Sequence, residues 1–201
     1  MKRGILGGTF DPIHLGHLLI AERVRQTLGL DEVIFVPAGD PWLKRHRFIS
    51  EVHHRLTMVS LAISGSPFFG LSDIETTRPG PSYTVETITE FRKSGGELYF
   101  ILGSDNLLSL PMWHRPLDLI NLCTLVVVPR FGGCAVDMSA LEERLPGISA
   151  KTTLLERPLI DVSSTEIRRR AAAGSPIDHL VSKKVEDYIK ANGLYTRYPG
   201  S

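Results

Sequence analysis

Residues 7–17 read GGTFDPIHLGH, and this stretch decides the fold because of what lies on either side of it. The apolar pair Ile5-Leu6 comes directly before it, and apolar residues at helical spacing follow over 18–28, with Gly29 as a stop signal. Glycines after an apolar pair are typical of a strand that ends in a tight turn. The sequence therefore predicts a strand, a glycine-rich loop and a helix in that order.

The rest of the chain repeats this alternation of strands and helices. Further strands are predicted at 33–36, 69–74, 98–102, 125–128 and 152–155, and further helices at 51–63 (capped by Ser50), 84–92, 165–173 and 183–191. Residues 125–128 are apolar at every position, which is typical of a strand buried on both faces. We predict an α/β fold, namely a doubly wound, Rossmann-like parallel sheet with a small C-terminal helical segment. Ligands of such sheets bind at the carboxyl ends of the strands.

Length and composition narrow the class of protein. A chain of 201 residues predicts a single domain spanning 1–201, with a helical C-terminal part at 162–195 and a poorly ordered end at 195–201. Lys and Arg total 23 against 22 Asp and Glu, a balance that argues against a nucleic-acid partner. No apolar run approaches the roughly 18 residues of a membrane span. We expect a cytoplasmic protein without a membrane partner, and the sequence leaves homo-oligomer formation open.

The loop at 7–17 has the features of a phosphate site. Gly7 and Gly8 let the backbone approach an anion closely, and the following helix start supplies unpaired N–H groups. His14 and His17 are three residues apart, which places both imidazoles on one helix face. Two alternatives are capping or core histidines and a metal pair, but a metal would need a third ligand that no nearby cluster supplies.

A second predicted phosphate segment lies near the other end of the chain. Residues 162–168 read VSSTEIR, which places three hydroxyls before a helix and Arg168 one turn into it. Ser163 and Glu166 have capping-box spacing, a local role that leaves the consecutive hydroxyls unexplained. Hydroxyls and an arginine at a helix start form an anion site. Arg169 and Arg170 are expected to be solvated charges.

Three further segments have features that suit a flat, anionic ligand. Ser82-Tyr83-Thr84 stands at a predicted helix start, where backbone N–H groups can bind a carboxylate, although an ordinary N-cap explains it too. Asp105 follows a buried strand and can accept ribose hydroxyls. Trp113 can stack on a ring or pack in the core.

The two phosphate segments resemble the paired signatures of the HxGH nucleotidyltransferase superfamily, with Val162 where the second signature has Ile. The resemblance implies nucleotidyl transfer from a nucleoside triphosphate, with His14, His17 and Arg168 as catalytic residues. It implies ATP binding by Gly7, Gly8, Thr9, Phe10, His17, Gly103, Ser163, Ser164, Thr165, Ile167 and Arg168. It also implies Mg²⁺ held mainly through the ATP phosphates, with no metal site built from protein side chains.

The middle segments resemble the bacterial nicotinate-nucleotide adenylyltransferase family. That resemblance implies AMP transfer from ATP to nicotinate mononucleotide, which yields deamido-NAD and pyrophosphate in NAD biosynthesis. The implied acceptor-binding residues are Asp11, Lys44, Ser82, Tyr83, Thr84, Asp105, Trp113 and Arg130. The chain departs from the family at 41–44, where PWLK replaces PPHK, and at 130–132, where RFG replaces an Arg-Pro-Gly sequence.

Two other functions remain as alternatives. Phosphopantetheine adenylyltransferase shares both terminal signatures but gives no reason for Ser82-Tyr83-Thr84 or for Trp113. A non-catalytic nucleotide-binding module needs neither His17 nor Arg168, and this chain has both.

Overall fold

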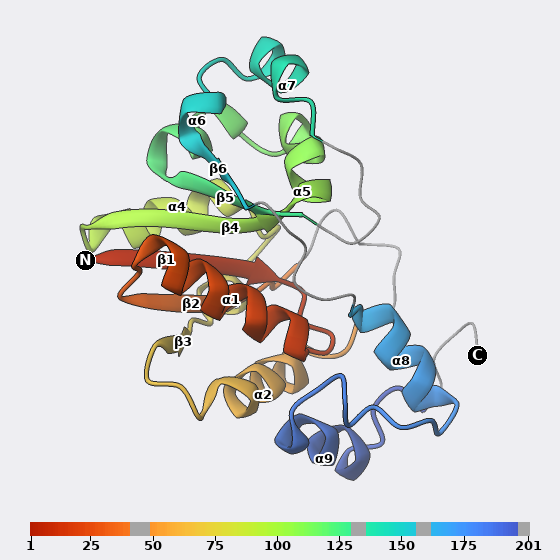
Figure 1. Ribbon diagram of the computed structural model, residues 1–201. Helices are drawn as coiled ribbons and strands as arrows, with labels where there is room; N and C mark the ends of the chain where they lie inside the picture. The colour runs from red at the N-terminus through yellow and green to blue at the C-terminus, as the bar shows by residue number, and fades with distance from the viewer. Residues whose placement is uncertain (41–48, 130–135, 156–161, 197–201) are drawn as a thin grey trace.

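The structure is a computed structural model that describes residues 1–40, 49–129, 136–155 and 162–196. Its strands are β1 (Lys2–Gly8), β2 (Glu32–Pro37), β3 (Phe69–Leu71), β4 (Glu97–Gly103), β5 (Thr124–Val128) and β6 (Thr152–Leu154). Its α-helices are α1 (Leu15–Leu28), α2 (Val52–Ile63), α3 (Ile74–Thr77), α4 (Thr84–Lys93), α5 (Ser104–Ser109), α6 (Pro116–Leu122), α7 (Met138–Arg144), α8 (Ser164–Ala172) and α9 (Lys183–Ala191). Two 3-10 turns are η2 (Leu110–Met112) and η3 (Ser149–Lys151). Figure 1 shows α8 and α9 beyond the carboxyl ends of the strands.

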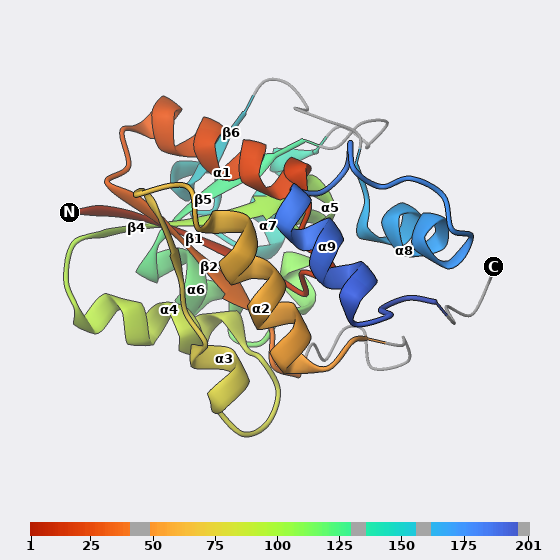
Figure 2. The same cartoon turned by 90° about the horizontal axis from the view of Figure 1, so that it is seen from below.

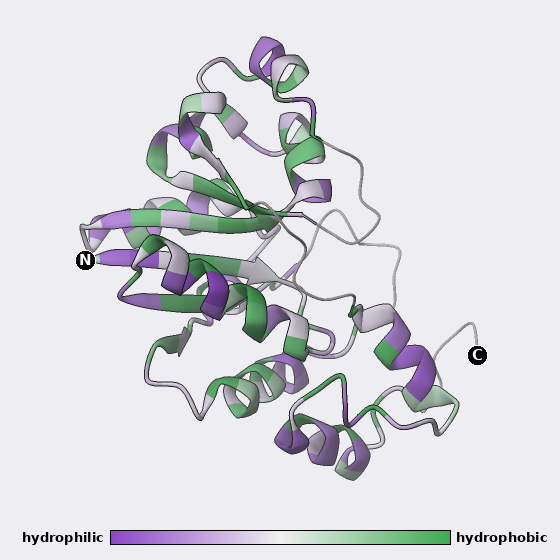
Figure 3. Ribbon diagram, in the orientation of Figure 1, coloured by the Kyte–Doolittle hydropathy of each residue, from purple (hydrophilic) through white to green (hydrophobic). Residues whose placement is uncertain are grey.

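The strands form one parallel sheet in the order β3-β2-β1-β4-β5-β6. The order reverses between β1 and β4, so the crevice at their carboxyl ends is the expected ligand site. Successive residues of a strand face opposite sides of the sheet. In β5, Val126 and Val128 join one apolar core while Leu125 and Val127 join the other, which explains a strand that is apolar throughout. Figure 3 shows the same apolar character along the central strands.

Each face of the sheet has its own set of helices. Residues of α1, α2, α8 and α9 bury one core with β1 and β2, whereas α4, α5, α6 and α7 bury the other with β4. Figure 2 shows α1 and α4 on opposite sides of the strands.

Within the described ranges, no helix has both the length and the apolar character that a membrane span requires.

The predicted fold class is confirmed, and the differences are local. The first helix begins at Leu15 rather than residue 18, because His14 is the extended N-cap residue. The strand predicted at 69–74 ends at Leu71, and the single-turn helix α3 follows it. Ser50 does not cap α2; Glu51 occupies the N-cap position instead. Helices α5, α6 and α7 were not predicted because six or seven residues are too few to show helical periodicity.

Candidate active site

The two predicted phosphate segments meet in the structure. The Ser164 hydroxyl donates to the Pro12 carbonyl at 3.0 Å, and Arg168 Nη1 donates to the Asp11 carbonyl at 2.6 Å. The two residues of the first contact are 152 positions apart in the sequence, and those of the second are 157 positions apart. The first loop and the start of α8 therefore form one surface beyond the carboxyl end of β1.

The two histidines stand at the start of α1 and contact each other. Their rings stack with centroids 3.7 Å apart, and the ring of Phe10 meets His17 edge-on at 5.0 Å. The backbone N–H of His14 donates to His17 Nδ1 at 3.2 Å. Because Nδ1 accepts this hydrogen bond, the ring proton of a neutral His17 is on Nε2, which makes Nε2 a hydrogen-bond donor.

Gly8, which precedes these histidines, has a packing role. A side chain at Gly8 would come within 2.9 Å of the Phe10 ring, so only glycine fits there without a shift. Phe10 is 2% exposed and has a φ of 50°, a backbone conformation that side chains rarely adopt. Its burial beneath the loop fixes the path of the backbone between β1 and α1.

The start of α8 confirms half of the predicted capping box. The Ser163 hydroxyl accepts from the Glu166 backbone N–H at 3.2 Å. The Glu166 side chain instead pairs with Arg169 and Arg170, whose hydrogen bonds lower its pKa to about 2. Those two arginines are thus the surface charges that the sequence predicted. Arg168 is different, since it is 8% exposed and also donates to Thr165 Oγ1 at 3.2 Å.

Asp11, which the family resemblance implies as an acceptor-binding residue, is 3% exposed, and its carboxylate is directed into the protein. Tyr195 donates to Oδ1 at 2.6 Å, and the backbone N–H of Ser50 donates to Oδ2 at 3.1 Å. The carboxylate therefore holds the first loop in place. The prediction of a poorly ordered end from residue 195 was wrong at Tyr195, which is buried; residues 197–201 lie outside the described ranges.

Arg55 is a site residue that sequence reasoning missed. Its side chain is 1% exposed, and Nη1 donates to the carbonyls of Thr9 and Ala38 at 2.9 and 2.8 Å. Burial lowers the pKa of this guanidinium, and the Asp11 carboxylate acts in the opposite direction. The sequence does carry a signal, because Arg55 stands three and four residues before the buried Met58 and Val59. Because arginine is mostly exposed in proteins, its place among core positions is the signal that could have pointed to Arg55.

A cavity of about 140 Å³ lies next to the phosphate segments, between the ends of β1 and β4 and the start of α4. Its lining includes Gly7, Gly8, Thr9, Ser82, Tyr83, Thr84, Asn106, Trp113 and His114. The structure thus brings together the predicted residues of the first loop with those at 82–84 and with Trp113. Tyr83 stacks on His114 at 4.2 Å, and Trp113 donates from Nε1 to the Ser109 hydroxyl at 3.1 Å. Both aromatic side chains are therefore fixed as cavity walls.

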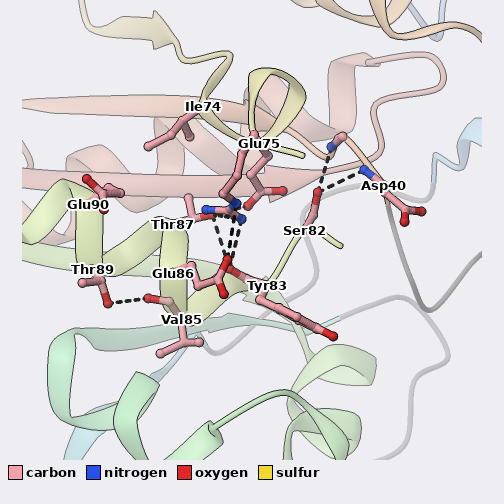
Figure 4. A network of polar contacts seen from close by, with 12 residues as sticks. Asp40, Ile74, Glu75, Ser82, Tyr83, Val85, Glu86, Thr87, Thr89 and Glu90 are labelled. Atoms are coloured by element: carbon pink, nitrogen blue, oxygen red, sulfur yellow. Dashed lines mark hydrogen bonds and ion pairs between the residues drawn. The ribbon is translucent and has the colours of Figure 1, made fainter. Parts of the chain in front are cut away.

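Another wall of the cavity is a polar network, seen in Figure 4. The Ser82 hydroxyl accepts from the backbone N–H groups of Gly39 and Asp40 at 2.9 and 3.2 Å, which ties the loop after β2 to the start of α4. The Thr87 hydroxyl donates to Glu75 Oε1 at 2.7 Å. Glu75 lines the cavity and was not predicted, because α3 itself was not predicted.

Comparisons with known proteins identify the family. A family model described as cytidylyltransferase-like matches residues 5–170. A probable nicotinate-nucleotide adenylyltransferase from Dehalococcoides mccartyi is 50% identical over 200 residues, which cover 98% of each chain. The chain belongs to the nicotinate-nucleotide adenylyltransferase family. Another member, from Roseiflexus sp. (strain RS-1), is 48% identical over 193 residues and 96% of each chain.

A solved structure confirms the fold of this family for the chain. The Plasmodium falciparum nicotinic acid mononucleotide adenylyltransferase complexed with NaAD superposes with a TM-score of 0.77 over 97% of each chain, at 24% identity. At that identity the likeness extends to the fold, which is the predicted Rossmann-like α/β sheet.

Several residues implied by the family resemblance lie elsewhere or outside the described ranges. Asp105 is exposed in the first turn of α5, one residue before Asn106 in the cavity wall, and Gly103 is the N-cap of the same helix. Ile167 is buried in the core. Lys44 and Arg130 both lie outside the described residues.

Proposed function

We propose that the chain transfers AMP from ATP to nicotinate mononucleotide, giving deamido-NAD and pyrophosphate. One observation carries the proposal: Gly7, Gly8 and Thr9 line the aromatic-walled cavity and belong to the same loop that leads into His14 and His17. A ring bound in the cavity and a triphosphate bound at the loop are therefore neighbours. Adenylyl transfer needs that arrangement, since its two reactants must meet in line.

The reaction requires positioning more than covalent participation by the protein. A phosphate oxygen of the acceptor attacks the α-phosphorus of ATP, and the bond from that phosphorus to the bridging oxygen breaks as pyrophosphate leaves. Donation from His17 Nε2, together with His14, would stabilise the charge that develops at the α-phosphate. The hydroxyls of Ser163, Ser164 and Thr165 would bind the outer phosphates at the start of α8. Arg168 holds the loop against α8.

A divalent cation, proposed as Mg²⁺, fits this site as a partner of the nucleotide. The described donors here are hydroxyls, imidazoles and a guanidinium, while the Asp11 carboxylate is engaged with Tyr195 and Ser50. Such groups suit phosphate oxygens better than a hard cation. The cation would be held through the triphosphate and, when bound, would neutralise the leaving pyrophosphate.

The cavity would bind the nicotinate ring. Its volume of about 140 Å³ is close to that of an engineered cavity of about 150 Å³ that holds one benzene molecule. Thr84 is the first residue of α4, so backbone N–H groups at this helix start can bind the ring carboxylate. Trp113 supplies an aromatic surface beside the ring, which favours stacking.

The test is pyrophosphate release from ATP and Mg²⁺ with three acceptors assayed in parallel: nicotinate mononucleotide, nicotinamide mononucleotide and phosphopantetheine. We expect a strong preference for nicotinate mononucleotide. A preference for phosphopantetheine would contradict the proposed acceptor, although it would still support adenylyl transfer as the reaction. Inactivity with all three acceptors, together with retained ATP binding, would instead indicate a non-catalytic nucleotide-binding module.

A further inference from the structure

A carboxyl group is built into the wall of the ring cavity. Glu75, on the single-turn helix α3, is 8% exposed and lines the cavity together with Tyr83, Thr84 and Trp113. The loop after β2 packs directly on α3, since a side chain at Gly39 would overlap the Glu75 carbonyl oxygen. Figure 4 shows this carboxyl between the Thr87 and Ser82 side chains. Glu75 is therefore held in a fixed place rather than free on the surface.

The surroundings of Glu75 neutralise its charge only in part. Burial raises the pKa of this carboxyl, against the opposing effects of hydrogen bonds from Thr87 and Ser82 and of the Arg78 charge. Arg78 is shared, because its Nε pairs with Glu86 at 3.3 Å. Among the described residues, the ionisable groups of the packed elements include Arg78 after α3 and Asp40 after β2, together with Glu86, Glu90, Arg92 and Lys93 on α4 and Tyr83 and His114 in the cavity wall. A bound cation would add a full positive charge to this partly compensated carboxyl.

The ring of nicotinate mononucleotide carries such a charge. Its nitrogen is bonded to ribose, which makes the ring a pyridinium cation, and its carboxylate makes the ring part a zwitterion. The start of α4 suits the negative end. Glu75 suits the positive ring, and the aromatic faces of Tyr83 and Trp113 attract a cation as well.

We propose that Glu75 is a specificity-determining residue that recognises the positive charge of the acceptor's pyridinium ring. The inference rests on the proposed function and extends it, since it explains the placement of an acidic group in a cavity that also receives a carboxylate. The start of α4 would bind the negative carboxylate of the ring part, and Glu75 on α3 would interact with its positive ring.

The burial of the Glu75 carboxyl also has a consequence for stability. A carboxyl whose pKa is raised by folding stabilises the folded state below its unfolded pKa, and this contribution is lost as pH rises through the folded pKa. Above the folded pKa, the ionised Glu75 therefore lowers the stability of the empty protein. Glu75→Gln keeps an acceptor for the Thr87 hydroxyl and removes the charge, so we expect an unchanged or higher melting temperature at pH 7.5, with a smaller change at pH 5.

The test compares nicotinate mononucleotide with its reduced 1,4-dihydro form, which keeps the carboxylate and the phosphate but has an uncharged ring. We measure kcat/KM for both acceptors in the wild type, in Glu75→Gln and in Glu90→Gln, an exposed carboxylate on α4 outside the cavity. We expect Glu75→Gln to lower the ratio of oxidised to reduced kcat/KM by about tenfold. The ratio cancels any loss of active protein.

Other outcomes would contradict the charge role of Glu75, its direct contact with the ring, or the proposed function. A ratio in Glu75→Gln within twofold of the wild type would overturn the charge role, and an equal fall in Glu90→Gln would show a long-range field rather than a contact. A marked fall in melting temperature at pH 7.5 with an unchanged ratio would make Glu75 a scaffold residue. Wild-type inactivity with both acceptors would overturn the proposed function, and this inference with it.

Discussion

The phosphate side and the ring side of the site use buried polar groups in opposite ways. On the phosphate side, Arg55 and Arg168 donate to backbone carbonyls of Thr9, Asp11 and Ala38, and so fix the course of the loop. On the ring side, the carboxyl of Glu75 and the hydroxyl of Thr87 stand in the cavity wall itself. A phosphate is bound largely by correctly placed backbone and side-chain donors, whereas a ring is distinguished by the groups that surround it. The difference indicates that geometry matters most on one side and chemical selection on the other.

The largest expected effect tests the phosphate side at its reacting group. His17→Ala removes the Nε2 donor at the α-phosphate, so we expect kcat to fall by about 10²–10³-fold. Binding of a non-hydrolysable ATP analogue, measured by calorimetry, should weaken by less than about tenfold, because the loop and α8 still hold the other phosphates. His53→Ala, an exposed imidazole on α2, is the control. A kcat within threefold of the wild type would contradict the proposed role.

The next effect tests the support of that loop. Tyr195→Phe removes the hydroxyl that donates to Asp11, and a buried hydrogen bond to a charged group contributes about 1.5–3 kcal/mol. We expect a loss of that size in the free energy of unfolding, measured by urea denaturation. Tyr99→Phe is the matched control, since Tyr99 also donates to a carboxylate, Glu97, at 2.9 Å but at the exposed surface. Equal losses in the two variants would show that burial of the Asp11 contact is unimportant.

A smaller effect separates the ring side from the phosphate side. Trp113→Ala removes one aromatic wall of the cavity, and we expect the KM for nicotinate mononucleotide to rise about tenfold. The KM for ATP should stay within about twofold, since the contacts described for Trp113 join it to Ser109 and Phe100 rather than to the loop or α8. Trp113→Phe should restore much of the loss. A parallel rise in both KM values would mean that the two sides are not separate.

The smallest effect concerns the arginines of α8. Arg169→Ala breaks an exposed pair with Glu166, and exposed pairs contribute little. We expect turnover within about twofold of the wild type in steady-state assays, whereas Arg168→Ala should lose most activity because it releases the Asp11 carbonyl. Similar losses in the two variants would contradict the separate roles assigned to neighbouring residues.

The same contrast explains what the sequence could predict. Both phosphate segments are contiguous, so the residue types that perform the chemistry can be recognised together at 7–17 and at 162–168. Arg55 has a partner 46 positions away along the chain, and Glu75 stands on a single-turn helix that shows no periodicity, so only the fold reveals their places. Asp11 shows the opposite case: its place in a recognised motif predicts a ligand contact, whereas the folded chain buries its carboxylate. A motif predicts which residues gather near a site, and burial decides which of them face the ligand.

The contact between Tyr195 and Asp11 also has a consequence for synthesis. Tyr195 is made by the ribosome 184 residues after Asp11. While those residues are being made, the loop lacks the hydroxyl that secures it. A fragment released before Tyr195 is made would carry both histidines without this support, so competence to use ATP should arrive only once Tyr195 is in place.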